Sequence, residues 1–155
     1  FIQIKRVEPR NVANSIREMR KNIINKNLSI TSNIKYSEGA LQDIDFLIQY
    51  AFFLYPNKSS ELLNLNFMQR FTFLTKLMND FEISELLLNY NFLKKIELSN
   101  QNIFGVNNSN ITNENMKLKR LMLFLNKEDI DNFKKEIISV LNRNNELFNK
   151  YLGSY

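Results

Sequence analysis

Residues 34–50 have the sequence IKYSEGALQDIDFLIQY, a short turn that leads into an apolar segment with two aspartates. Gly39 is one of three glycines in the 155 residues. A lone glycine before an apolar run usually supplies a backbone angle that other residues adopt only at a cost. From Leu41 onward, apolar residues cover most of the circumference of a helix near residues 41–55. Such a helix belongs in the middle of a bundle.

Asp43 and Asp45 fall in the first two turns of this predicted helix. One interpretation is favourable placement near the positive end of the helix dipole, which contributes roughly a few tenths of a kcal/mol. The other is a D-x-D metal pair. Residues two apart on a helix point to nearly opposite faces, whereas they share a face on a strand. We therefore expect no self-contained metal site here.

Composition predicts an all-α fold in one compact domain. The chain has 44 % hydrophobic residues and only two prolines, and its length allows one sizeable core. No apolar run reaches membrane-spanning length without a charge or an amide, so we expect no membrane partner. Neither cysteine nor histidine occurs, which excludes disulfides, thiolate metal sites and histidine-based triads. Because the first residue is Phe1, we interpret the chain as part of something longer.

The net charge of +5 arises within residues 1–26, and the remainder of the chain sums to zero. A helix beginning at Pro9 would carry the basic face of this segment, formed by Arg10, Arg17 and Lys21. Its apolar positions recur at helical spacing: Val12, Ile16, Met19 and Ile23. The basic face is either solvated or meets phosphates or an acidic partner. Nucleic acid is not expected, because interleaved aromatic residues and a known recognition motif are both absent.

The remaining pattern predicts a single bundle of about five to six helices in residues 9–155, with residues 1–8 as a linker from an upstream domain. After the first two helices, we expect helices over about 60–78 and 85–101, a short one ending near residue 125 and a last one ending at Gly153. The predicted N-terminal caps of the last three helices are Ser84, Thr112 or Asn113, and Asn126 paired with Asp129. Residues 102–113 are rich in asparagine and predict a loop.

Three stretches resemble one known family. KYSEGALQDIDFLIQY is similar to the motif that opens the helical domain of the glutamine-synthetase adenylyltransferases, and more distantly to the PII uridylyltransferases. SIREMRKNI (residues 15–23) resembles the helix of that family that carries V-R-E-M-R. YNFLKKIELSNQ (residues 90–101) resembles its Y-x-F-L-R-x-x-E-x-x-x-Q, with a lysine in place of the arginine. The order and approximate spacing of the three stretches agree with the family.

The chain also departs from the family pattern, at Ser37, Ala40, Gln42, Asp45 and Leu98. Two of these residues replace glycines, which costs most where positive backbone angles are needed. The catalytic domain of such enzymes lies upstream and carries a G-S-x-x-D-x-D strand, which this sequence lacks. By itself, the chain is not expected to transfer a nucleotide.

The resemblance implies a cytoplasmic parent enzyme that transfers AMP from ATP, with Mg²⁺, to a tyrosine of glutamine synthetase. Its implied partners are the upstream nucleotidyltransferase domain, glutamine synthetase and a PII-type signalling protein, and no cofactor belongs to this chain itself. The resemblance places Lys35, Gly39 and Asp43 toward the nucleotide cleft. It also implies that five further residues act as polar partners between helices: Asp45, Gln49, Lys94, Glu97 and Gln101.

Two alternatives stay open. The carboxylates and Gln101 can instead fix helix register through buried hydrogen bonds. A buried carboxylate without a partner would cost several kcal/mol, so Lys94 or an arginine of the first helix should pair with one of them. The whole chain can instead be a non-catalytic interaction module, or a degenerate paralogue, that uses the basic face of Arg10, Arg17 and Lys21.

Overall fold

The computed structural model describes residues 8–26, 33–54, 65–105, 110–111 and 115–153. These residues form helices and turns without a strand, and one isolated bridge pairs Asn33 with Asn110. The all-α prediction is therefore confirmed. No described helix is long and apolar enough to cross a membrane.

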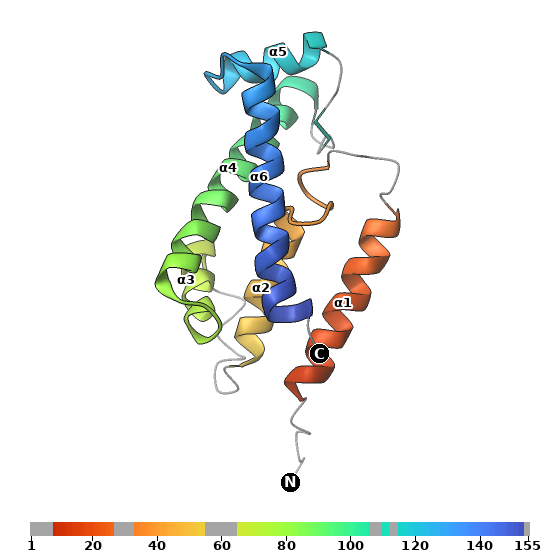
Figure 1. Cartoon of the computed structure of the whole chain (residues 1–155), viewed down its shortest axis with the longest axis vertical. Coiled ribbons are helices and arrows are strands. Elements are labelled where there is room, and N and C mark those ends of the chain that lie inside the picture. The colour runs from red at the N-terminus through yellow and green to blue at the C-terminus, as the bar shows by residue number, and fades with distance from the viewer. Residues whose placement is uncertain (1–7, 27–32, 55–64, 106–109, 112–114, 154–155) are drawn as a thin grey trace.

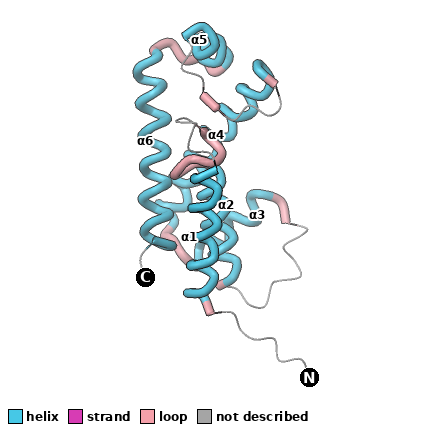
Figure 2. The backbone as a smooth tube through the Cα atoms, turned by 90° about the vertical axis from the view of Figure 1, so that its right-hand side faces the viewer, coloured by secondary structure: helices cyan, strands magenta, loops and turns pink. Residues whose placement is uncertain are grey.

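Six α-helices and two tighter or wider turns follow one another along the described chain. Their bounds are α1 Pro9–Lys26, α2 Leu41–Phe53, α3 Phe67–Phe71, the 3₁₀ turn η2 Thr72–Lys76, α4 Asp80–Phe104, α5 Asn115–Phe124, α6 Ile130–Phe148 and the π turn η3 Asn149–Gly153. The long helices α4 and α6 run along the molecule, α1 lies on the other flank and α5 closes one end (Figures 1 and 2). The shorter α2 lies among them and contacts α1, α4 and α6.

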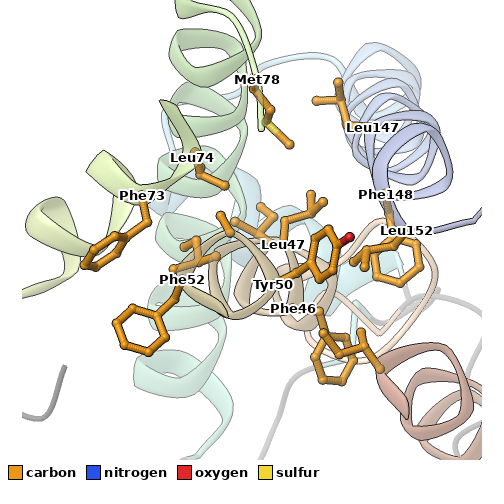
Figure 3. Packing of buried hydrophobic residues seen from close by; sticks show 14 of the residues in the cluster. Phe46, Leu47, Tyr50, Phe52, Phe73, Leu74, Met78, Leu147, Phe148 and Leu152 are labelled. Carbon is orange, nitrogen blue, oxygen red and sulfur yellow. The ribbon is translucent and has the colours of Figure 1, made fainter. Parts of the chain in front are cut away.

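The position of α2 explains its composition. Nine of its thirteen residues are buried, so the prediction of a central apolar helix is confirmed. Figure 3 shows its side chains between those of η2 and the end of α6; the labelled residues include Phe46, Leu47, Tyr50, Leu74, Leu147 and Phe148. A second apolar cluster joins α4, α5 and α6 around Leu93, Leu121 and Phe133.

The predicted start of the fourth helix is wrong. Asn79 is the N-cap of α4: its side chain accepts the Glu82 N–H at 2.9 Å, and Glu82 accepts the Asn79 N–H at 3.4 Å. This reciprocal capping box starts the helix five residues before Ser84, which is exposed inside it. The helix also continues to Phe104, past the predicted end at residue 101, and stops before Gly105 at φ +107°.

The predicted helix over residues 60–78 is also wrong within the described part of that range. A short α3 begins after Asn66, which forms a capping box with Gln69, and passes into η2. The Thr72 and Thr75 hydroxyls donate to carbonyls three residues earlier, a spacing that matches the tighter 3₁₀ turn. Residues 60–64 lie outside the described residues.

Three further expectations have separate outcomes. The N-cap of α6 is Asp129, which accepts the Asn132 N–H at 2.9 Å, whereas Asn126 adopts φ +54° in the preceding turn. In α1, Met19 is 51 % exposed, so it is not part of the apolar face. The predicted caps Thr112 and Asn113, and linker residues 1–7, lie outside the described residues.

Candidate functional site

The turn that enters α2 is held by its own backbone and by one asparagine. The Asn33 side-chain oxygen accepts the N–H groups of Lys35 and Tyr36, each at 2.9 Å. The Leu41 N–H then donates to the Ile34 carbonyl at 3.2 Å. Gly39 adopts φ +73°, which confirms the prediction that it supplies an unusual backbone angle.

Gly39 is also required by space. A Cβ atom added there would lie 1.8 Å from the Leu141 carbonyl oxygen of α6. The Gly39 carbonyl accepts the Asn144 side-chain N–H at 2.8 Å, and Asn144 in turn accepts one from Asn89 of α4 at 2.8 Å. The turn is therefore bonded to α6 directly and to α4 through one asparagine.

Asp43 fixes the other side of this turn. Its carboxylate accepts the Gly39 N–H at 2.6 Å and two N–H groups of Arg20 at 2.6 and 2.9 Å. Arg20 also donates to Asn145 at 2.6 Å and stacks on the Phe148 ring, 4.1 Å from its centroid. The predicted pairing of a buried carboxylate with an arginine of the first helix is thus confirmed.

The side chain of Asp43 is almost completely removed from solvent. The residue is 2 % exposed, and burial raises its pKa while the Arg20 guanidinium opposes this rise. The closed environment gives Asp43 a role in joining α1, α2 and α6. Sequence reasoning did not single out Arg20 as a site residue. Its signal was its position as the second arginine of the V-R-E-M-R-like stretch.

Asp45 lies on the opposite side of α2 from Asp43 and is exposed. Desolvation raises the pKa of Asp45, and the positive charges of Lys94, Arg70 and Lys35 lower it. The two aspartates face apart as predicted, and the described residues contain no group of three or more potential metal-ligating side chains.

We define the motif face as Lys35, Asp45, Gln49, Lys94 and Glu97. Gln49 is exposed one turn beyond Asp45 on α2. On α4, Glu97 is buried and its carboxylate lies 2.5 Å from the half-buried Lys94 ammonium. Lys35 is half-buried in the Gly39 turn, with its Nζ 5.2 Å from the centroid of the Tyr36 ring. The half-buried Gln101 lies one turn beyond Glu97.

The basic residues of α1 lie elsewhere. A groove of about 310 Å³ is lined by Arg17, Arg20 and Lys21 together with Glu38 of the Gly39 turn and residues at the end of α6 and in η3. Arg10 is not among the lining residues. Arg17 donates to the Leu152 carbonyl at 2.8 Å, so part of this basic face serves to close the end of η3. The structure thus brings together two of the three predicted partner-surface residues.

Comparison with known proteins places most of the chain in one family. No curated protein matches the chain. A protein-family model described as GlnD PII-uridylyltransferase matches residues 10–152, which cover all six α-helices apart from Pro9, the first residue of α1. The chain therefore belongs to the glutamine-synthetase adenylyltransferase and PII uridylyltransferase family, as its helical domain.

Proposed function

We propose that this domain forms one wall of the nucleotide cleft of a cytoplasmic protein nucleotidyltransferase whose catalytic domain lies upstream. The observation that carries the proposal is the motif face. Its polar residues come from the Gly39 turn, α2 and α4, and the buried Asp43–Arg20 pair holds that turn in place. A fixed turn can hold Lys35 where a phosphate would pass, as a point charge on a flexible stem.

The reaction that we propose for the parent is attack by a tyrosine hydroxyl on the α-phosphate of ATP, with release of pyrophosphate. Phosphorolysis would remove the adenylyl group again, because inorganic phosphate would take the AMP from the tyrosine and leave as ADP. The proposed acceptor is glutamine synthetase, with a PII-type protein as regulator. The name of the matching family supports a second acceptor, the PII protein itself, with a uridylyl group from UTP. The upstream carboxylates would hold Mg²⁺, which would neutralise charge on the phosphates.

The first experiment is calorimetry with Mg²⁺·ATP and Mg²⁺·UTP on this chain and on the full-length parent. We expect binding by the parent alone, because the domain supplies only one wall. The nucleotide that binds, tested with both acceptor proteins, then identifies the reaction. Absence of binding by the parent to either nucleotide would contradict the proposal.

The second experiment is Lys35→Ala in the full-length parent. We expect a lower rate of nucleotidyl transfer with little change in thermal unfolding, because Lys35 makes no ion pair that holds the described fold. Lys119→Ala is the control, since Lys119 is an exposed lysine of α5 at the far end of the molecule. Equal transfer rates in wild type and Lys35→Ala would remove Lys35 from the cleft.

The groove of Arg17 and Lys21 favours a second candidate function, an interaction module for an acidic partner. A full-length gene without a G-S-x-x-D-x-D strand upstream would support this candidate over a transferase. Its direct test is salt-dependent binding of a poly-glutamate peptide to the chain. Lys21→Glu should weaken that binding, and Lys119→Glu should leave it unchanged if the groove is the site.

A further inference from the structure

Arg70 lies beside the motif face but belongs to none of the three family-like stretches. It is an exposed residue of α3, and its Nε donates to the Leu65 carbonyl at 3.2 Å. Within the described residues, its two terminal amino groups make no hydrogen bond or ion pair. The Nε bond therefore orients the guanidinium.

Aromatic packing fixes α3 next to α4. The Phe67 ring stacks on the Tyr90 ring with centroids 3.8 Å apart and planes at 21°. The buried Phe71 meets the same tyrosine edge-on at 6.2 Å. Tyr90 lies one turn before Lys94 on α4, so this contact brings α3 to the edge of the motif face. A short helix with a capping box and two ring contacts can hold Arg70 in a defined position.

The charges around Asp45 leave a positive excess. Lys35, Arg70 and Lys94 are the cations that act on Asp45, and Glu97 is the other carboxylate beside it. Glu97 already binds Lys94 at 2.5 Å, which leaves the positive charges of Lys35 and Arg70 to act on the single exposed carboxylate of Asp45. Two cations from different elements suit a ligand with several negative charges. The planar guanidinium can bind a phosphate through two N–H groups at once.

We propose that Arg70 contacts the polyphosphate of the nucleoside triphosphate, together with Lys35, on the motif face. This inference rests on the proposed function, because it assigns a further binding residue to the same cleft. It separates the roles of the elements. The Gly39 turn and α3 would each contribute one cation to the phosphates, and the Lys94–Glu97 pair within α4 would lie beside them with no net charge.

The experiment measures binding of three probes to the full-length parent by calorimetry: ATP, inorganic tripolyphosphate and adenosine. We expect Arg70→Ala to weaken ATP and tripolyphosphate binding by about tenfold, the loss typical of one charge-assisted hydrogen bond. Adenosine binding should not change. Arg70→Lys should keep part of the affinity because it keeps the charge, and Lys119→Ala should match wild type.

The outcomes distinguish this inference from the function on which it rests. If Lys35→Ala weakens tripolyphosphate binding and Arg70→Ala does not, the assignment of Arg70 is wrong and the cleft remains. If wild-type parent binds neither ATP, UTP nor tripolyphosphate, the proposed function itself fails. Arg70→Gln keeps much of the stem and an N–H donor, so it replaces Arg70→Ala if that variant does not fold. Unchanged binding in a folded Arg70→Gln variant also overturns the inference.

Discussion

At the scale of single residues, Gly39 is the position with the least freedom to change. It combines a positive φ with a backbone contact to α6, and these two demands have separate physical causes. Gly105 separates these two demands, because it also has a positive φ, but an added Cβ there meets nothing within 4 Å among the described residues. The chain thus contains its own matched control for the effect of close packing.

We expect Gly39→Ala to lower the free energy of unfolding by at least about 3 kcal/mol, because the new methyl group would collide with the Leu141 carbonyl. Gly105→Ala should cost about 1–3 kcal/mol, the range for backbone strain alone. Urea unfolding of both variants measures the difference. Equal losses would show that the contact with α6 adds nothing to the requirement for glycine.

Arg20 and Asp43 give the second prediction at this scale. Arg20→Met leaves a buried carboxylate without its cation, so we expect a loss of about 3–5 kcal/mol. Removing both charges, in an Arg20→Met and Asp43→Asn double variant, should cost less than the sum of the two single changes. Thermal or urea unfolding of the four proteins completes the double-mutant cycle. Additive losses would contradict a direct interaction.

The sequence predicted part of this cluster and missed the rest for a physical reason. A buried carboxylate needs a partner, which pointed to Lys94 or to an arginine of the first helix. Asn144 could not be found in this way, because its side chain serves the Gly39 carbonyl from 105 positions away. Helical periodicity marks which residues face inward, but it does not state which polar groups meet across helices.

At the scale of elements, apolar periodicity predicts the interiors of the helices, whereas local capping interactions set where they begin and end. The apolar period predicted α1 and α2 well. The start of α4 was placed too late because Ser84 was taken as its N-cap, and Phe81, an apolar residue in the first turn of α4, is 73 % exposed rather than buried. Ser84 is a good capping residue in isolation, yet the Asn79 and Glu82 pair begins the helix earlier. The break between α3 and η2 has an equally local cause in its two threonines.

The two competing caps make a direct test. We expect Asn79→Ala to lower stability by about 1 kcal/mol, the usual cost of losing an N-cap side chain. Ser84→Ala should change it by no more than about 0.5 kcal/mol, because Ser84 lies exposed inside the helix. Both changes are small polar-to-alanine substitutions five residues apart, measured by the same urea unfolding. A larger loss of stability for Ser84→Ala than for Asn79→Ala would show that α4 begins at Ser84.

At the scale of the whole molecule, the end of the chain returns to the start of α4. Lys150 and Tyr151 of η3 bind Glu82 at 2.7 and 2.5 Å, and Glu82 also belongs to the capping box of α4. Arg17 of α1 closes the same η3 turn at the Leu152 carbonyl. The π turn therefore joins both flanks of the bundle. The sequence predicted where the last helix stops, at Gly153, but not these contacts, because they join segments 68 to 135 positions apart.

Glu82 makes this connection sensitive to acid. Desolvation acts to raise its pKa, but the hydrogen bonds from Lys150 and Tyr151 prevail and hold the pKa of Glu82 below its ordinary value of 4.5. A lowered folded-state pKa means that the carboxylate stabilises the fold fully above the unfolded-state pKa. That contribution is lost as the pH falls through the lower folded-state pKa.

We therefore expect wild type to exceed Glu82→Gln in stability at pH 7, and we expect this difference in the free energy of unfolding to narrow steadily below about pH 4.5. Urea unfolding at a series of pH values measures the gap, and Glu128→Gln, at an exposed position before α6, controls for the loss of one charge. A gap that stays constant from neutral to acidic pH would show that the charge of Glu82 does not hold η3 against α4.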